Sequence, residues 1–196
     1  MKGSLKLHKY AQEIDNLSLK WKFKLQPVAI PRTLNNLSDK ISKCLDLEDY
    51  SVTIEFFDKC CQLFELECNY DRFANNLNTK TILFNSSSFC VGTSDVDSFC
   101  YGWGQGSVNW LFPPPRLVIK TINHLMLCNG IGLLVAPIWK SAHFHAYLEN
   151  SEILMNTRKK LIFGGKNVFK HGSDKSSYFG PEFDSEVGVW NFDFRN

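Results

Sequence analysis

The sequence predicts an α/β protein with a layered sheet and a C-terminal antiparallel hairpin. From residue 52 onward, short apolar, strand-like runs alternate with stretches of helical periodicity, which is the pattern of a layered α/β fold. The run "GIGLLVAPIW" at 130–139 is apolar throughout, as expected of a parallel strand that is buried on both faces. Two strand patterns close the chain on either side of a polar Gly/Ser loop at 164–181, and they indicate an antiparallel pair.

Composition limits the class of protein. The chain has 196 residues, enough for one good core, and 44% of them are hydrophobic, which indicates a folded chain rather than a disordered one. Its longest apolar run is far shorter than the roughly 18 residues that span a membrane, and the charged N-terminus lacks the apolar centre of a signal peptide. We therefore expect an intracellular protein, cytoplasmic or nuclear, with no membrane partner. The seven cysteines include no CxxC pair, so we expect free buried thiols.

The N-terminal quarter contains three predicted elements and a linker. Apolar residues recur near helical spacing at 4–16, which predicts a helix. Polar and apolar residues alternate in "LKWKFKLQPVAI" (19–30), which predicts a half-buried strand. A short amphipathic helix is predicted at 31–45, followed by a linker at 46–50.

Downstream, the same two periodicities, 3.6 for helices and 2 for strands, define the expected elements. Helices are predicted at 52–65, 116–128 and 141–155. Strands are predicted within 66–75 (ending near Asp71), at 80–85, in the run that ends at Phe112, and at 130–139, 159–165 and 186–195.

Three consecutive prolines, Pro113, Pro114 and Pro115, follow the strand that ends at Phe112. Proline has no N–H and a fixed φ, so it ends a strand and is tolerated at the first position of a helix. The stretch therefore predicts a strand, a proline turn and a helix. In an open α/β sheet, ligands bind at such carboxyl ends of strands. The alternative is a rigid loop with no ligand.

Charge is distributed unevenly along the chain. Residues 1–43 hold nine Lys/Arg against three Asp/Glu, whereas residues 44–100 hold three against ten. A basic N-terminal part is typical of a chain that contacts nucleic acid there, and a lysine-rich solvated helix face is the alternative. The residues that we expect to contact DNA or RNA, without sequence specificity, are Lys20, Lys22, Lys24 and Arg32.

The stretch "IPRTLNNLSDKIS" (30–42) resembles the last segment of the ribonuclease H domain in retroelement reverse transcriptases, through Pro31, Arg32, Asn35, Asp39 and Ser42. The resemblance implies that residues 1–45 are a partial ribonuclease H-like segment and that Asp39 is a catalytic carboxylate. That reaction uses two metal ions clamped by several carboxylates, so Asp39 alone is expected to be inactive. Mg²⁺ is expected only if the domain is completed. Asp39 as an ordinary helix-surface residue is the alternative.

From about residue 50 the chain is similar to the region that follows ribonuclease H in DIRS-like, tyrosine-recombinase retrotransposons. The matching stretches occur in the right order and, with the preceding segment, cover most of residues 30–147. They are "DRFANNLN" (71–78), "FNSSSF" (84–89), "DVDSFCYGW" (95–103), "NWLFPPPRLVIKTINHL" (109–125) and "GLLVAPIWKSAHF" (132–144).

That downstream region in turn resembles phage-type DNA adenine N6-methyltransferases, so residues 51–196 are expected to form a degenerate domain with a Rossmann-like, methyltransferase-type sheet. The resemblance implies a relic S-adenosylmethionine pocket at Asp71 and Asp97. It also places "LFPPP" where the family has an Asp or Asn, two prolines and an aromatic ring that together hold a flipped adenine. Here Phe112 replaces the hydrogen-bond acceptor and Pro115 replaces the ring, so methyl transfer should be lost.

Taken together, these features predict a retroelement-derived, nucleic-acid-associated module without catalytic activity on its own. The expected partners are DNA or RNA and the rest of a polyprotein, and no cofactor is expected, although S-adenosylmethionine stays possible. The alternatives are part of an active reverse transcriptase/ribonuclease H polyprotein, or a DNA adenine N6-methyltransferase-like enzyme.

Overall fold

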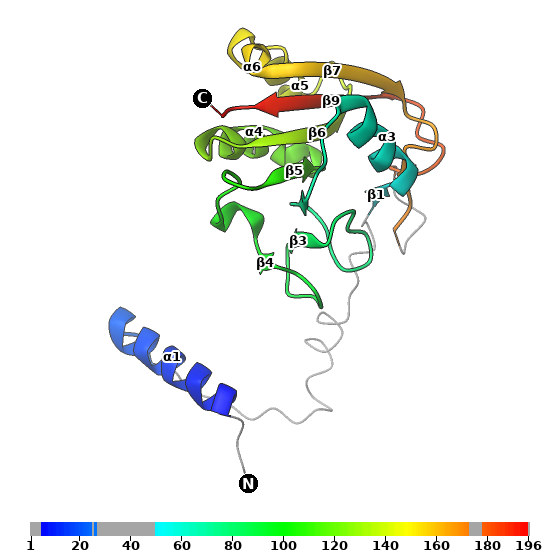
Figure 1. The fold of residues 1–196 in the computed structure, drawn as a ribbon. Helices are drawn as coiled ribbons and strands as arrows, with labels where there is room; N and C mark the ends of the chain where they lie inside the picture. The colour runs from blue at the N-terminus through cyan, green and yellow to red at the C-terminus, as the bar shows by residue number, and fades with distance from the viewer. Residues whose placement is uncertain (1–4, 25, 27–49, 173–177, 196) are drawn as a thin grey trace. The chain divides into compact units, whose positions relative to one another are not determined.

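The computed structural model describes residues 5–24, 26, 50–172 and 178–195 (Figure 1). The chain divides into two compact units, Met1–Cys44 and Leu45–Asn196. The predicted helix at 31–45 lies outside the described residues, as do Arg32, Asp39 and all of the predicted linker except Tyr50.

The described part of the first unit contains the long helix α1 (Leu5–Trp21). The predicted strand at 19–30 is therefore wrong at its start, because residues 19–21 are helical and residues 22–24 form a turn and an irregular segment. Lys22 has a φ of 53°, and the side chain of Trp21 is 67% exposed instead of half-buried. Leu and Lys are good helix formers, and a strand needs a partner that this short alternating run does not find in the described part of the chain.

The second unit is mixed α/β and is built on a mostly parallel seven-stranded sheet. Its order is β4-β3-β2-β5-β6-β9-β7, in which the first five strands run parallel and β9 is antiparallel to both β6 and β7. The expected α/β class and C-terminal antiparallel hairpin are confirmed. The strands are β2 (Tyr70–Asp71), β3 (Leu83–Ser86), β4 (Asp95–Val96), β5 (Val108–Leu111), β6 (Ile131–Pro137), β7 (Thr157–Gly164) and β9 (Glu186–Asp193).

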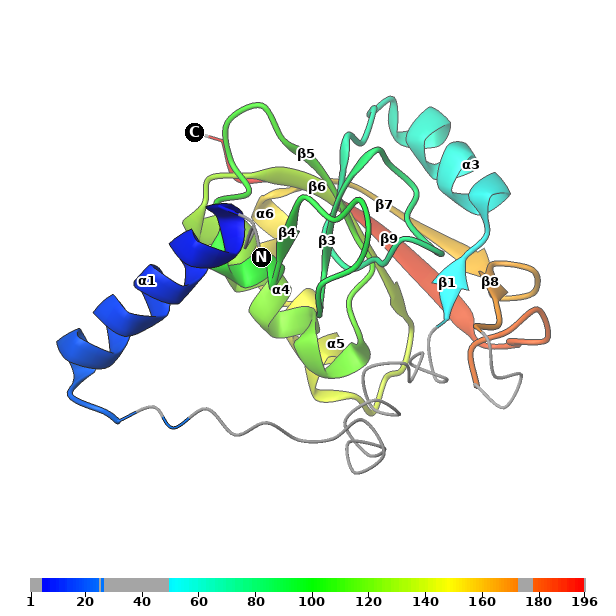
Figure 2. The same ribbon diagram turned by 90° about the horizontal axis from the view of Figure 1, so that it is seen from below.

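Helices cover both faces of this sheet (Figure 2). Helix α3 (Ile54–Phe64) packs on one face, where Leu133 and Val135 of β6 join its core cluster. The alternate residues of β6, Leu134 and Ala136, face a second cluster with the helices of the other face. Those helices are α4 (Val118–Leu127), α5 (His143–Leu148) and α6 (Ser151–Met155). Strand β6 is thus buried on both sides, as its apolar run predicts.

Two further features refine the predicted elements. The helix predicted at 141–155 is two short helices, α5 and α6, because Asn150 caps a new helix by accepting a hydrogen bond from the backbone N–H of Glu152 at 2.8 Å. A second, two-stranded sheet pairs β1 (Ser51–Val52) with β8 (Phe169–Lys170) in antiparallel fashion. Strand β8 forms within the predicted Gly/Ser loop, where no strand was expected.

Candidate functional site

The candidate site lies where the sheet reverses its order. Strand β2 is followed by β3 and β4 on one side, whereas β5 is followed by β6 on the other. The carboxyl ends of parallel strands meet at one edge of a sheet, and the point where the order reverses is where doubly wound folds bind ligands. Asp71 is the last residue of β2, in register with Trp110 of β5, and Phe112 directly follows β5. The structure therefore brings Asp71 and the proline turn to the same edge.

Asp71 is buried, with 2% of its surface exposed. Its Oδ1 accepts a hydrogen bond from the backbone N–H of Phe73 at 3.3 Å, and its Oδ2 accepts one from that of Lys80 at 3.0 Å. Burial raises the pKa of Asp71 to about 6, partly offset by these two bonds and by the Lys80 charge. Both carboxylate oxygens of Asp71 thus accept hydrogen bonds from backbone N–H groups of the loop that follows β2.

Asp97, the other predicted cofactor residue, follows β4 at the same edge but two strands away from β2. It is exposed, has a φ of 57° and caps the short 3-10 helix η1 (Ser98–Cys100) by accepting a bond from the N–H of Phe99 at 3.2 Å. Its carboxylate therefore shapes a local turn. Asp97 does not line the cavity beside Asp71, so the structure does not assemble the two into one pocket.

The cavity at Asp71 is small, with a volume of about 10 Å³. It has room for about one water molecule, whereas pockets for small-molecule ligands begin at roughly 300 Å³. This cavity therefore has no room for S-adenosylmethionine. The cavity is lined by Tyr50, Ser51, Val52, Asp71, Phe73, Asn78, Lys80, Trp110 and Phe112.

Aromatic side chains from distant parts of the chain pack against Tyr50 and Phe112, which line this cavity. Phe112 meets Tyr50 edge-on at 5.5 Å between ring centroids and stacks on Phe169 of β8 at 5.5 Å. Tyr50 in turn stacks on Phe179 at 4.1 Å. We call Tyr50, Phe112, Phe169 and Phe179 the aromatic plug. The partly buried ring of Phe112 is thus engaged in packing.

The proline turn has the predicted form of a strand followed by a helix. Pro113 is buried, Pro114 caps the 3-10 helix η2 (Pro115–Leu117), and α4 continues directly from η2. The N–H of Leu117 donates to the carbonyl of Pro114 at 2.8 Å. At the start of a helix the missing N–H of Pro115 costs nothing. The three prolines therefore form the connection from β5 to η2 and α4.

One residue that the sequence analysis did not single out organises the middle of the sheet. Arg72 is 3% exposed, and its Nε and Nη1 donate to the side-chain oxygens of Asn109 (2.7 Å) and Asn85 (2.9 Å). Its guanidinium lies 3.6 Å from the ring centroid of Tyr70. Burial lowers the pKa of Arg72 to about 10. The signal in the sequence is the pair of asparagines inside two strands, where asparagine is disfavoured.

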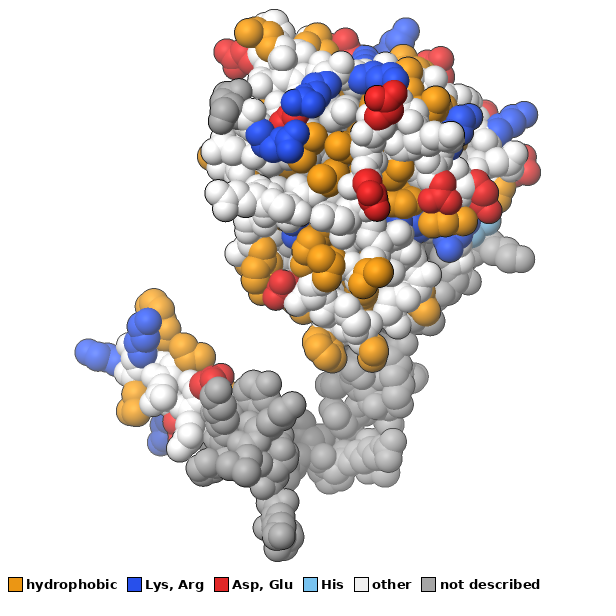
Figure 3. Space-filling model, viewed as in Figure 1, with side chains coloured by type: hydrophobic (Ala, Val, Ile, Leu, Met, Phe, Trp, Pro, Cys, Tyr) orange, Lys and Arg blue, Asp and Glu red, His pale blue; other side chains and the backbone are white. Residues whose placement is uncertain are grey.

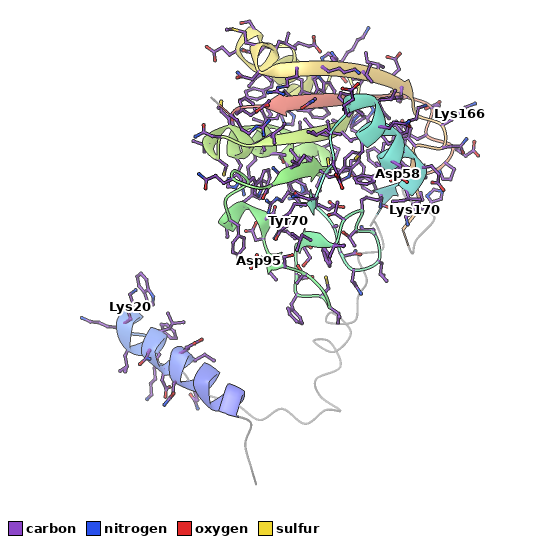
Figure 4. All side chains as sticks on the ribbon, viewed as in Figure 1. Lys20, Asp58, Tyr70, Asp95, Lys166 and Lys170 are labelled. Carbon is purple, nitrogen blue, oxygen red and sulfur yellow. The ribbon has the colours of Figure 1, made fainter. Side chains whose placement is uncertain are left out.

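A larger hollow of about 280 Å³ opens at the start of α3, away from the reversal point, and it involves none of the predicted residues. Lys59, Lys166, Phe56 and Phe163 are among the residues that line it. Figure 4 labels Lys166 there and Lys20 on α1. Lys20, Lys22 and Lys24, the predicted nucleic-acid residues inside the described part, are all exposed.

Among the described residues, no group of three or more His, Cys, Asp or Glu side chains is placed to hold a metal ion. The helices described here include none that is both long enough and apolar enough to cross a membrane. No protein-family model matches the chain, and neither does any curated protein.

Proposed function

We propose that this chain is a non-catalytic, nucleic-acid-associated module of a retroelement polyprotein, in which residues 51–196 keep a methyltransferase-type sheet without a usable cofactor site. The observation that carries the proposal is the closed edge at Asp71. A cavity of about 10 Å³ is left beside Asp71, and Tyr50 and Phe112 of the aromatic plug line it.

The order of the strands supports the methyltransferase-type part of the proposal. Counted in chain order from β2, the parallel strands lie in the order 3-2-1-4-5, as in doubly wound nucleotide-binding folds. An antiparallel strand, β9, then inserts between the fifth strand and β7. The doubly wound order agrees with the sheet that the resemblance implies, and the antiparallel hairpin agrees with the strand patterns at the end of the chain.

The chemistry at the proline turn argues against methyl transfer. Adenine methylation requires the base to leave the helix stack and to be held by its exocyclic amine and its ring. The side chain of Phe112 has no atom that accepts a hydrogen bond, and Pro115 has no aromatic ring to stack on a base. Phe112 also packs against Tyr50 and Phe169, so its ring is not free to contact a substrate.

Exposed lysines and aromatic rings at the end of α1 support contact with a nucleic acid. Lys20, Lys22 and Lys24 alternate with Trp21 and Phe23, whose exposed fractions are 67% and 47%. Proteins that bind single strands combine cationic groups for the phosphates with rings on which bases stack. By contrast, the face of the second unit seen in Figure 3 carries both charge signs interspersed.

Fluorescence anisotropy with a labelled single-stranded oligonucleotide tests the proposal. The variant K20Q/K22Q/K24Q is compared with K59Q/K166Q/K170Q, which removes the same charge from the second unit. Each lost phosphate contact makes the slope of log affinity against log salt shallower by about 0.7 for single strands. If all three lysines contact phosphates, the slope of K20Q/K22Q/K24Q should be shallower than that of the unaltered chain by about 2. The slope of the control variant should equal that of the unaltered chain.

Trp21→Ala is expected to weaken binding by about 1–3 kcal/mol, the usual value of one stacked base. Equal losses in the two lysine variants would place the contact elsewhere. Unchanged binding in both would remove the nucleic-acid part of the proposal.

A further inference from the structure

The C-terminal end of α3 brings two cysteines together. Glu65 has a φ of 52° and ends the helix, with its N–H bonded to the carbonyls of Cys61 and Gln62. The N–H of Leu66 then donates to the Cys61 carbonyl at 3.0 Å. These bonds turn the chain back beside the last helical turn, so that Cys68 returns toward Cys61 just before β2 begins.

The side chains of Cys61 and Cys68 interact with each other. Cys68 is buried at 7% exposure, and its Sγ also lies 3.8 Å from the carbonyl oxygen of Asn109 on β5. Cys61 packs against the same core cluster but is partly exposed. The neighbouring Cys60 is fully buried. Cys61 is thus partly accessible to solvent, whereas Cys68 is buried.

Their environments give the two thiols different reactivity. The hydrogen bond from Cys68 lowers the pKa of Cys61 to about 7, against the opposing effects of burial and of Asp58. The same bond, together with burial, raises the pKa of Cys68. Burial raises the pKa of Cys60 to about 12. The thiolate is the reactive form of cysteine, so Cys61 is suited to attack first and Cys68 to react second.

We propose that Cys61 and Cys68 form a reversible disulfide by exchange with a small-molecule disulfide such as glutathione disulfide. The Cys61 thiolate attacks one sulfur of glutathione disulfide, which forms a mixed disulfide and releases one glutathione thiolate. Cys68 then loses its proton to solvent and attacks Sγ of Cys61, which expels the second glutathione thiolate. Two thiols of the protein are oxidised, and one glutathione disulfide is reduced to two glutathione molecules. Excess reduced glutathione reverses both steps.

The disulfide would tie the C-terminal turn of α3 to the residue that precedes Asn69 and β2. Strand β2 ends at Asp71. The disulfide would therefore fix the start of the strand whose last residue lines the cavity at the closed edge. This inference does not depend on nucleic-acid binding or on the methyltransferase resemblance.

The test uses the full chain, incubated with glutathione disulfide, alkylated at its free thiols and digested with trypsin together with a glutamate-specific protease. Cleavage after Lys59 and Glu65 releases a peptide with Cys60 and Cys61, and cleavage after Glu67 and Arg72 releases one whose single cysteine is Cys68. We expect mass spectrometry to show these two peptides joined, and excess reduced glutathione to separate them. Because the unaltered chain gives the main result, the test does not depend on the folding of a variant.

Three variants assign the pairing. Cys60→Ser should keep the link, whereas Cys61→Ser should abolish it. Cys68→Ser should leave glutathione attached to Cys61. A link that survives in Cys61→Ser would make Cys60 the partner and overturn the proposal. So would an unaltered chain in which Cys61 keeps its glutathione or stays a free thiol under the same conditions.

Discussion

Because Asp71 is buried at the closed edge of the sheet, the free energy of unfolding should depend on pH. Its pKa is raised from the ordinary value of 3.8 to about 6, mainly because the carboxylate is buried. In the unfolded chain the group is exposed and ionises near its ordinary value. The protonated form is therefore favoured by folding, and Asp71→Asn, which is neutral at every pH, is the matched variant.

The sign and the size follow from proton linkage. Between about pH 4 and pH 6 the folded protein binds more protons at Asp71 than the unfolded chain does, so stability falls as pH rises through this window. Each tenfold change in proton affinity is worth 1.36 kcal/mol, so the raised pKa corresponds to about 3 kcal/mol. That contribution is fully present below about pH 4 and is lost above about pH 6.

Urea unfolding, followed by fluorescence of the buried Trp103 and Trp110, measures this effect. The free energy of unfolding of the unaltered chain minus that of Asp71→Asn should fall by about 2.4 kcal/mol between pH 4 and pH 7. Subtracting the variant removes the effect of all other titrating groups. A difference that stays flat would mean that Asp71 titrates near its ordinary value. The edge would then be open to water, and the proposal of a closed cofactor site would fail.

Three further outcomes are expected. Arg72→Met leaves two buried amide oxygens without a hydrogen-bond donor, so it should lower the free energy of unfolding by about 2–4 kcal/mol in urea titrations. Arg158 is exposed, so Arg158→Met should lower the same free energy by less than about 1 kcal/mol. Similar losses in the two variants would contradict the bridging role of Arg72. The unaltered chain should transfer no labelled methyl group from S-adenosylmethionine to duplex DNA and show no binding in calorimetry; clear transfer would mean that Phe112 and Pro115 do not stand at the adenine-binding position. The chain should not cleave an RNA–DNA hybrid in Mg²⁺ or Mn²⁺, and cleavage that disappears in Asp39→Asn would show that the carboxylate at this position is catalytic.

Local sequence was sufficient for the elements whose pattern depends on few neighbours. The continuous apolar run at 130–139 indicated a strand buried on both faces, and β6 lies between two core clusters. The three prolines after Phe112 indicated a change from strand to helix, because proline restricts the backbone wherever it occurs. The apolar patterns at the end of the chain indicated the antiparallel pair of β7 and β9.

Local patterns were insufficient where two structures compete for the same residues. The alternation at 19–24 is compatible with a strand, yet residues 19–21 continue α1 because their intrinsic helix preference is high and no strand of the described residues pairs with them. The helical periodicity at 141–155 does not show that Asn150 starts a second helix, since its side chain caps the backbone only once the chain has turned.

The sequence by itself determined the α/β class, the position of most strands in the second unit and the placement of Asp71 and Phe112 at strand ends. Only the tertiary structure decided whether those strand ends enclose a usable site. The plug that fills the edge combines Tyr50, Phe112, Phe169 and Phe179, which are far apart in the chain and meet through the pairing of β1 with β8. Likewise, the buried charge of Arg72 depends on asparagines from two other strands. Cavity volume, burial and pKa are properties of such long-range packing, and periodicity along the chain carries no information about them.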